Sequence, residues 1–362
     1  MHYKMADVVT EIKEKEDHPS ESKYERFVGL EHYVSGEIVI RNYGGTEILE
    51  SAMKVFHSGD ILVARRNVYL KRASVAFFDG LTSGDSIILR AKTERIGRLL
   101  PFVLNTNEFW DYADQYSDGT MSKRLSPKTL LEYEFDLPNE EDQDALADLL
   151  WAAVDTKFAY QRLLKQTDDL VKSQFIEMFT DTPKGKLSDI AMITMGQSPD
   201  GKTYNTDGNG MPFYQGKTEF GDLYIGDATT WTTAPTRIAE ANDVLMSVRA
   251  PVGSTNVATK MCCLGRGLAG IRSIEGKSTT MFILYSMRSI EDDIENMGVG
   301  STFKAINKDV VYNLPIPIAS IELQNKFVAL AEQSDKSKFE IKESIKNIDD
   351  LMRSIMQQNF VS

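Results

Sequence analysis

Two short patterns between residues 265 and 278 contain the residue types that bind phosphates. Gly265-Arg-Gly267-Leu-Ala-Gly270 matches by letter the glycine pattern of dinucleotide-binding turns. That chemistry needs a helix after the turn, whereas the chain continues as Ile271-Arg-Ser-Ile274, which favours a strand. Gly276-Lys277-Ser278 lacks the earlier glycine of a phosphate loop, because residue 271 is isoleucine. The glycines therefore predict a tight turn between strands and not a nucleotide site.

No other residues gather in a recognisable catalytic pattern. Ser198 and Ser254 have no histidine near them in sequence, so nothing favours a triad. Cys262 and Cys263 are adjacent, so they cannot form an ordinary disulfide with each other, and a reduced cytoplasmic setting is expected. With the scattered histidines they do not provide a four-ligand zinc site. The histidines are His2, His18, His32 and His57. The Asn/Asp-Pro-Pro-Tyr/Phe run of adenine methylases is absent. We expect no catalytic, metal or cofactor site on this chain.

The chain contains an internal duplication. Residues 119–179 align without a gap with residues 300–360, at a constant offset of 181 positions. Upstream, Gly59-Asp-Ile-Leu-Val-Ala-Arg-Arg66 resembles Asn242-Asp-Val-Leu-Met-Ser-Val-Arg249. Two long copies differ from a solenoid, which has three or more short repeats. A duplicated binding domain suits a molecule that recognises a target in two parts.

Each copy ends in a segment without proline or glycine, residues 139–180 and 320–360, which predicts one long helix. The second segment has an a/d heptad seam at Ile341, Ile345, Ile348, Met352 and Ile355. The first has the same rhythm at Leu146, Leu150, Ala153, Tyr160, Leu164 and Val171, interrupted at Lys157 and Thr167. Such a helix would extend about 60 Å, which exceeds one domain. We predict that the two helices pack on each other, antiparallel, rather than each on its own domain.

Short strand-like runs broken by glycine, asparagine, aspartate and proline fill the rest of the chain. The predicted fold is α/β, with mixed α+β globular domains that are pseudo-symmetric and separated by a pair of long antiparallel coiled-coil helices. The predicted boundaries are 1–138, 139–181, 182–318 and 319–362. No stretch reaches the 18 apolar residues typical of a membrane helix.

The formal net charge is −12, but the charge is unevenly distributed. Residues 139–180 hold nine acidic and four basic side chains, whereas residues 181–318 are near balance, with 15 and 13. Binding to nucleic acid needs a local basic face rather than a basic total. If the chain binds DNA, its acidic net charge predicts a basic partner protein that shares the DNA.

Several blocks in the second copy resemble a known family over about 175 residues. They are Gly196–Asn205, Met211–Gly221, Asp243–Gly253, Cys263–Arg272, Gly300–Ile306 and Leu314–Pro317. In this order they resemble the target-recognition domain of the specificity subunit of type I restriction–modification enzymes. The first copy matches more loosely, because it lacks counterparts of Gln197-Ser-Pro199 and Arg249-Ala-Pro-Val-Gly253.

The resemblance implies a non-catalytic subunit with two target-recognition domains. Each domain would read one half of a bipartite double-stranded DNA site, and the helices would set the spacer between the halves. The resemblance also implies partners: two methyltransferase (modification) subunits docked on the helices and, in a full restriction complex, two restriction and motor subunits. S-adenosylmethionine is expected on the partner methyltransferase and not on this chain.

Direct readout of DNA uses Arg or Lys on guanine and Asn or Gln on adenine, from loops that reach the major groove. In the second copy we select Gln215, Lys217 and Arg249, which lie beside glycines or at strand ends. In the first copy the basic cluster after the strand comprises Arg65, Arg66, Asn67, Lys71 and Arg72. Lys123 and Lys304 share a repeat position that suits phosphate contact. The alternative for these residues is a solvated surface.

Two other classes of function stay open on sequence alone. One is an enzyme whose catalytic residues are scattered along the chain. The other is a coiled-coil protein-interaction scaffold that does not read DNA. A salt-dependent and sequence-selective affinity for DNA would separate a specificity subunit from a scaffold.

Overall fold

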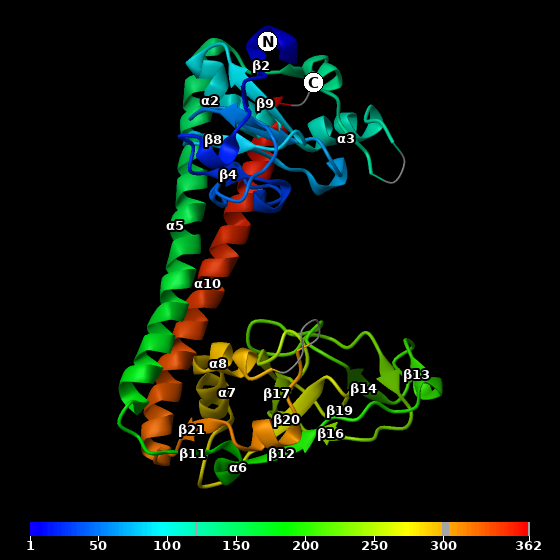
Figure 1. The fold of residues 1–362 in the computed structure, drawn as a ribbon, viewed down its shortest axis with the longest axis vertical. Coiled ribbons are helices and arrows are strands. Elements are labelled where there is room, and N and C mark those ends of the chain that lie inside the picture. Colours follow the sequence, from blue (N-terminus) through cyan, green and yellow to red (C-terminus); the bar gives the residue numbers. More distant parts are fainter. Residues whose placement is uncertain (120–121, 299–303, 361–362) are drawn as a thin grey trace. The chain divides into compact units, whose positions relative to one another are not determined.

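The computed structural model describes residues 1–119, 122–298 and 304–360. The chain divides into two compact units, unit 1 (Met1–Gln161 with Lys342–Ser362) and unit 2 (Arg162–Ile341). Two helices of 40 residues, α5 (Glu140–Phe179) and α10 (Ile321–Phe360), each contribute one half to each unit (Figure 1). The globular parts of the two units are called domain 1 and domain 2. The predicted block Gly300–Ile306 falls mostly outside the described residues.

Domain 1 contains two four-stranded sheets and a two-stranded ribbon. The first sheet is antiparallel throughout, in the order β2 (Val9–Ile12), β9 (Ser86–Ala91), β6 (Ile61–Ala64) and β7 (Ala73–Val75). The second has the order β3 (Lys15–Glu16), β5 (Met53–Phe56), β8 (Gly80–Thr82) and β4 (Phe27–Val28). The ribbon pairs β1 (His2–Lys4) with β10 (Glu134–Asp136). The α-helices are α1 (Met5–Val8), α2 (Glu94–Val103), α3 (Asn107–Gln115) and α4 (Pro127–Leu131). Short 3₁₀ turns are η1 (Pro19–Glu21), η2 (Leu30–His32) and η3 (Val68–Leu70).

Domain 2 repeats this plan with a larger second sheet. Its first sheet has the order β12 (Ala191–Met195), β20 (Leu268–Ser273), β17 (Val244–Ser247) and β18 (Thr255–Val257). The second has the order β13 (Tyr204–Asn205), β15 (Trp231–Thr232), β14 (Met211–Tyr214), β19 (Cys262–Leu264) and β16 (Ile238–Ala239). The ribbon pairs β11 (Lys184–Lys186) with β21 (Pro315–Pro317). The helical segments are α6 (Leu187–Ile190), η4 (Gly201–Thr203), α7 (Thr280–Ser289), α8 (Glu291–Asn296) and α9 (Lys308–Tyr312). Mixed α/β domains with two long helices confirm the predicted fold class.

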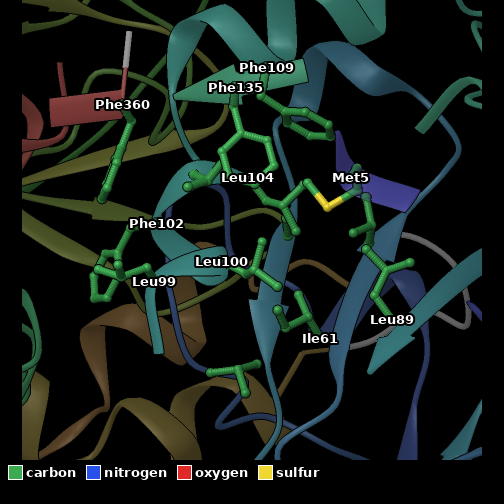
Figure 2. Close-up of a cluster of buried hydrophobic side chains, with 14 of the residues drawn as sticks. Met5, Ile61, Leu89, Leu99, Leu100, Phe102, Leu104, Phe109, Phe135 and Phe360 are labelled. Carbon is green, nitrogen blue, oxygen red and sulfur yellow. The ribbon is translucent and has the colours of Figure 1, made fainter. Parts of the chain in front are cut away.

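The inner strand β6 is apolar at every position because both faces of its sheet are covered. In β6, Ile61 and Val63 pack into the main core of unit 1, while Leu62 and Ala64 pack into a separate cluster on the other face. Figure 2 shows the main core, where Ile61 and Leu89 of the sheet lie near residues from α2 such as Leu99 and Leu100. Strand β17 divides in the same way.

A buried aspartate explains why the Gly/Asn-Asp pair recurs at residues 59–60 and 242–243. Asp60 is 1% exposed and accepts hydrogen bonds from Arg90 Nε and Nη2, at 2.7 and 2.8 Å. Asp243 accepts the equivalent pair from Arg272, at 2.8 and 3.0 Å. These hydrogen bonds raise the pKa of both arginines despite the opposing effect of burial. The repeated motif is therefore part of the frame of each domain.

Residues 59 and 242, which precede these aspartates, both have left-handed backbones. Gly59 has φ +93° and Asn242 has φ +70°. Glycine and asparagine are the residue types that adopt this conformation most easily. The repeated Gly/Asn before the aspartate is thus explained by the turn that leads into each central strand.

The long helices contact each other through equivalent ion pairs. In unit 1, Lys157 Nζ lies 2.8 Å from both Asp349 Oδ1 and Glu37 Oε1. In unit 2, Lys338 Nζ lies 2.9 Å from Asp168 Oδ1, which reverses the roles of the two helices. Because Lys157 meets a late residue of α10 and Asp168 meets an earlier one, the helices run antiparallel. The interruption of the heptad pattern at Lys157 is thereby explained.

The apolar stripes of the two long helices pack against the domains as well as against the partner helix. Leu146, Leu150 and Val154 of α5 belong to the main core of unit 1, together with Met352 and Phe360 of α10. Phe360 points into this core beside Phe102 and Phe135 in Figure 2. We predicted that the two helices pack on each other rather than each on its own domain. That choice was too narrow, because the same apolar stripes also complete the domain cores. Such sharing adds apolar burial that a two-helix seam alone cannot supply.

Candidate nucleic-acid interface

An open cleft of about 310 Å³ lies in domain 2 between the ends of several strands. It is lined by Ser198, Gln215, Gly216, Lys217, Thr218, Ser247, Arg249, Ala250, Arg266 and Gly267. Three of these side chains are cationic, one is an amide, and none is acidic. Lys217, Arg249 and Arg266 are exposed and form no side-chain hydrogen bond or ion pair with the described residues. As far as the described residues show, the donors of these three side chains are available to a ligand.

The glycine turn between β19 and β20 makes this convergence possible. A Cβ atom at Gly267 would lie 2.2 Å from the carbonyl oxygen of Gln215, and one at Gly265 would lie 2.9 Å from the Cα atom of Gln215. The Gly265 amide donates to the Tyr214 carbonyl at 2.8 Å. The turn can therefore lie against the end of β14 only without side chains at these two positions. The predicted interpretation of these glycines as a tight turn between strands is confirmed.

The basic cluster of domain 1 is built from the corresponding chain segments. The Leu125 amide donates to the Arg65 carbonyl at 2.8 Å, and the Asn67 amide donates to the Lys123 carbonyl at 3.0 Å. In domain 2 the Ile306 amide donates to Val248 at 3.0 Å and the Ala250 amide to Lys304 at 2.9 Å. Lys123 and Lys304 thus occupy equivalent positions. The predicted residues Arg65, Arg66, Asn67 and Lys123 of domain 1, and Arg249 and Lys304 of domain 2, therefore lie where equivalent segments meet.

The cations of domain 1 differ from those of domain 2 because they have partners within their own domain. Lys123 forms an ion pair with Asp114, and Lys71 donates to Asn107 Oδ1 at 3.0 Å. Arg66 Nη1 lies 3.5 Å from Asp85 Oδ2. Arg72 donates to the carbonyl oxygens of Leu30 and Arg66, at 2.9 and 3.0 Å. The Asn67 side chain accepts from Ser122 Oγ at 3.0 Å.

The half-buried Arg65 and Arg72 of this cluster support the structure of the domain as well as its charge. Arg65 Nε donates to the Leu125 carbonyl at 3.1 Å. Burial, followed by the repulsion of Arg124, lowers the pKa of the Arg65 guanidinium. Burial also lowers the pKa of Arg72. Arg65 and Arg72 therefore support the strand ends, while Arg66 remains 53% exposed at the surface.

The structure adds three residues that were not predicted. Arg266 lines the domain 2 cleft from the glycine turn, and Arg124 and Asp85 lie beside Arg66 in domain 1. Arg266 could have been found, because an arginine between two glycines at a strand-to-strand turn is well placed to project. Lys304 borders the cleft through its backbone, but its side chain is not part of the lining.

No group of three or more potential metal ligands occurs within the ranges that the structure describes. Cys262 and Cys263 are both buried and unpaired, and burial raises the pKa of the Cys262 thiol to about 12. Among residues 1–119, 122–298 and 304–360 no helix is both long and apolar enough to cross a membrane.

Comparison with known proteins gives a consistent family relationship for the second half of the chain. Residues 181–348 match the model of the type I restriction modification DNA specificity domain. A relative in Methanocaldococcus jannaschii, named as the specificity subunit of a type I restriction enzyme, is 40% identical over 167 residues. That alignment covers 44% of this chain and 39% of the relative, so it spans about two fifths of the relative's length.

Solved structures resemble the whole chain. One, from work on complex assembly and conformational transition of the type I R–M system, is 27% identical with a TM-score of 0.62. It covers 99% of this chain and 96% of its own. The S subunit of a type I system from M. genitalium shares the fold at 14% identity, with a TM-score of 0.57 and coverage of 100% and 96%. Residues 181–348 are therefore similar to the DNA specificity domain of type I restriction–modification systems, and the whole chain is similar to a solved structure from work on such a system.

Proposed function

We propose that this chain is the sequence-specific DNA-binding specificity subunit of a type I restriction–modification complex. Each domain reads one half of a bipartite site in double-stranded DNA. Domain 1 (1–138) and domain 2 (182–318) are the recognition domains, and segments 139–181 and 319–362 set the spacer and dock the methyltransferase subunits. The family relationship of residues 181–348 supports this proposal.

The observation that carries the proposal is the cleft of domain 2. Lys217, Arg249 and Arg266 project there without acidic neighbours in the lining, beside the amide of Gln215. Arginine and lysine pair with guanine O6 and N7 or with phosphates, and glutamine pairs with adenine N6 and N7. A cleft with this combination has the donors that readout in the major groove requires.

The catalytic groups are assigned to the partners. Two methyltransferase subunits hold S-adenosylmethionine and transfer the methyl group, and in a restricting complex two restriction and motor subunits join them. The complex acts in the cytoplasm, where it meets DNA. The acidic first turn of α5, with Glu140, Glu141 and Asp142, suits a basic partner that shares the DNA.

The first test is the methylome of cells that express this chain with the methyltransferase encoded beside it, compared with cells that express each protein alone. We expect N6-methyladenine in one bipartite motif with a fixed gap, only when both proteins are present. Methylation by the methyltransferase alone at the same motif would refute the assignment of specificity to this chain. Association of the two proteins without any methylation would contradict it as well.

The second test measures the salt dependence of DNA binding by the purified complex. Phosphate contacts release counterions, so log K should fall linearly with log salt on specific and non-specific duplexes. A flat salt response together with stable association of the proteins would support the coiled-coil scaffold instead.

A further inference from the structure

Domain 1 places one carboxylate between two exposed guanidinium groups. Asp85 Oδ1 accepts from Arg124 Nη2, and Asp85 Oδ2 lies 3.5 Å from Arg66 Nη1. The Arg66 and Arg124 side chains are 53% and 48% exposed, whereas Asp85 is 22% exposed. The carboxylate therefore lies beneath two arginines that face solvent. The backbones of Arg66 and Arg124 also pair as an isolated β-bridge, which fixes their separation.

The equivalent turn of domain 2 carries an arginine and no carboxylate. The Ser86 amide donates to Ser83 at 3.1 Å in domain 1, and the Leu268 amide donates to Gly265 at 3.0 Å in domain 2. The Arg65 and Val248 amides donate to the carbonyls of Asp85 and Gly267, respectively, at 2.9 Å. Asp85 and Gly267 are therefore equivalent positions. Domain 1 has a carboxylate where domain 2 has a glycine that follows an arginine.

We propose that Asp85 is a positioning residue that orients Arg66 and Arg124 to read guanine in the half-site of domain 1. This inference rests on the proposed DNA-specificity function. A guanidinium binds guanine through two parallel hydrogen bonds, so its plane must be held in one orientation. A free arginine loses much rotamer entropy when it binds, and a neighbouring carboxylate removes part of that loss in advance. Because the cluster also contains Arg65, Asp85 by itself does not neutralise the three guanidiniums.

The same arrangement makes two opposite predictions for the Asp85→Asn variant. Loss of a negative charge should raise the affinity for non-specific DNA, because Arg66 and Arg124 are then free to bind phosphates. Loss of orientation should lower the discrimination between the correct base pair and its substitutes. A role for Asp85 in simple charge neutralisation would raise specific and non-specific affinity by the same factor.

The experiment uses the complex of the full chain with its methyltransferase, and duplexes in which each base pair of the domain 1 half-site is replaced in turn. For Asp85→Asn, we expect the ratio of specific to non-specific affinity to fall by about 5- to 100-fold, at guanine-containing positions of that half only. Arg66→Lys and Arg124→Lys should lower the ratio at the same positions, since an ammonium cannot form the bidentate pair.

Asp114→Asn is the matched control, because it removes the same charge from the same domain and breaks the ion pair with Lys123. It should raise specific and non-specific affinity together and leave their ratio unchanged. An unchanged ratio in Asp85→Asn, in a complex whose unsubstituted form discriminates its target, would overturn the inference alone. Uniform losses in Arg66→Lys and Arg124→Lys across all duplexes would also overturn it, in favour of phosphate contacts. An unsubstituted complex with no discrimination would instead contradict the proposed function.

Discussion

Domain 1 and domain 2 share a structural frame and differ in the charged side chains at their strand ends. Both hold a buried aspartate against an arginine of the neighbouring strand, and both bring the same three segments together at the strand ends. In domain 2 the cations of these segments lack intramolecular partners within the described residues, whereas in domain 1 Asp85 and Asp114 pair with them. Duplication has therefore preserved the supporting ion pair, whereas the charged residues at the strand ends have diverged.

The shared frame should be the most sensitive part of each domain. Replacement of Arg90 or Arg272 by methionine leaves a buried carboxylate without its counter-ion, which typically costs about 3–5 kcal/mol of unfolding free energy. We expect similar losses in the two variants, measured by urea denaturation of the full chain. A large loss in one variant and none in the other would show that the two frames are not equivalent.

The glycine turns should respond in opposite ways to the same substitution. In Gly267→Ala the new methyl group would lie 2.2 Å from the Gln215 carbonyl oxygen, so the cleft must distort, with a cost of about 1–3 kcal/mol. A Cβ atom at Gly84, in the equivalent turn of domain 1, would have no neighbouring atom within 4 Å. Gly84→Ala should therefore leave thermal stability and DNA affinity near those of the parent. Thermal unfolding and binding to the target duplex check both variants.

The lysines of the two domains should differ in their contribution to DNA binding. Lys217→Ala should lower affinity for all sequences about equally and reduce the magnitude of the salt slope by about 1, as expected for one phosphate contact. Lys123→Ala should have a smaller effect, because its ammonium group is already paired with Asp114. Titrations of the complex at several salt concentrations measure both slopes. Equal slope changes would show that the pairing in domain 1 is not maintained on DNA.

The smallest expected difference is a pH effect confined to domain 1. Hydrogen bonds that the His2 ring donates to Asp136 first, and then to Glu134, raise the pKa of His2 at the pairing of β1 with β10. A raised pKa means that this contribution to stability is complete below about pH 6.5 and is lost as pH rises through the raised value. Domain 2 has no histidine in its corresponding ribbon.

We expect parent and His2→Gln to differ slightly in thermal unfolding at pH 6 and to converge at pH 9, because the His2 side chain is exposed and solvent screens its ion pairs. A difference that grows with pH would contradict this sign.

Sequence patterns predicted the helices and the duplication because these depend on local periodicity. The lack of proline and glycine marked both helical segments, and the repeated aspartate marked equivalent strands. The arginines that pair with these aspartates lie 30 and 29 residues further along the chain, and no pattern connects them in sequence. In sequence Lys157 only interrupts the heptad pattern, whereas in the structure it forms two ion pairs. Its partners could not be predicted because they come from two distant segments.

The candidate site was predicted only in part for a related reason. Gln215, Lys217 and Arg249 could be selected separately from their loops, but their convergence depends on the close approach of the glycine turn. The pairing of Arg66 with Asp85 and of Lys123 with Asp114 was not foreseen. A basic cluster in sequence carries no information about the acidic groups that the fold brings to it.

The division of the long helices between the two units has a consequence for the order of folding during synthesis. Unit 2 is made from one continuous stretch, Arg162–Ile341, whereas the core of unit 1 includes Met352 and Phe360 from the far end of α10. Domains generally fold as they leave the ribosome, in the order of synthesis. Here the unit that is translated first cannot close its core until the other unit has been translated completely.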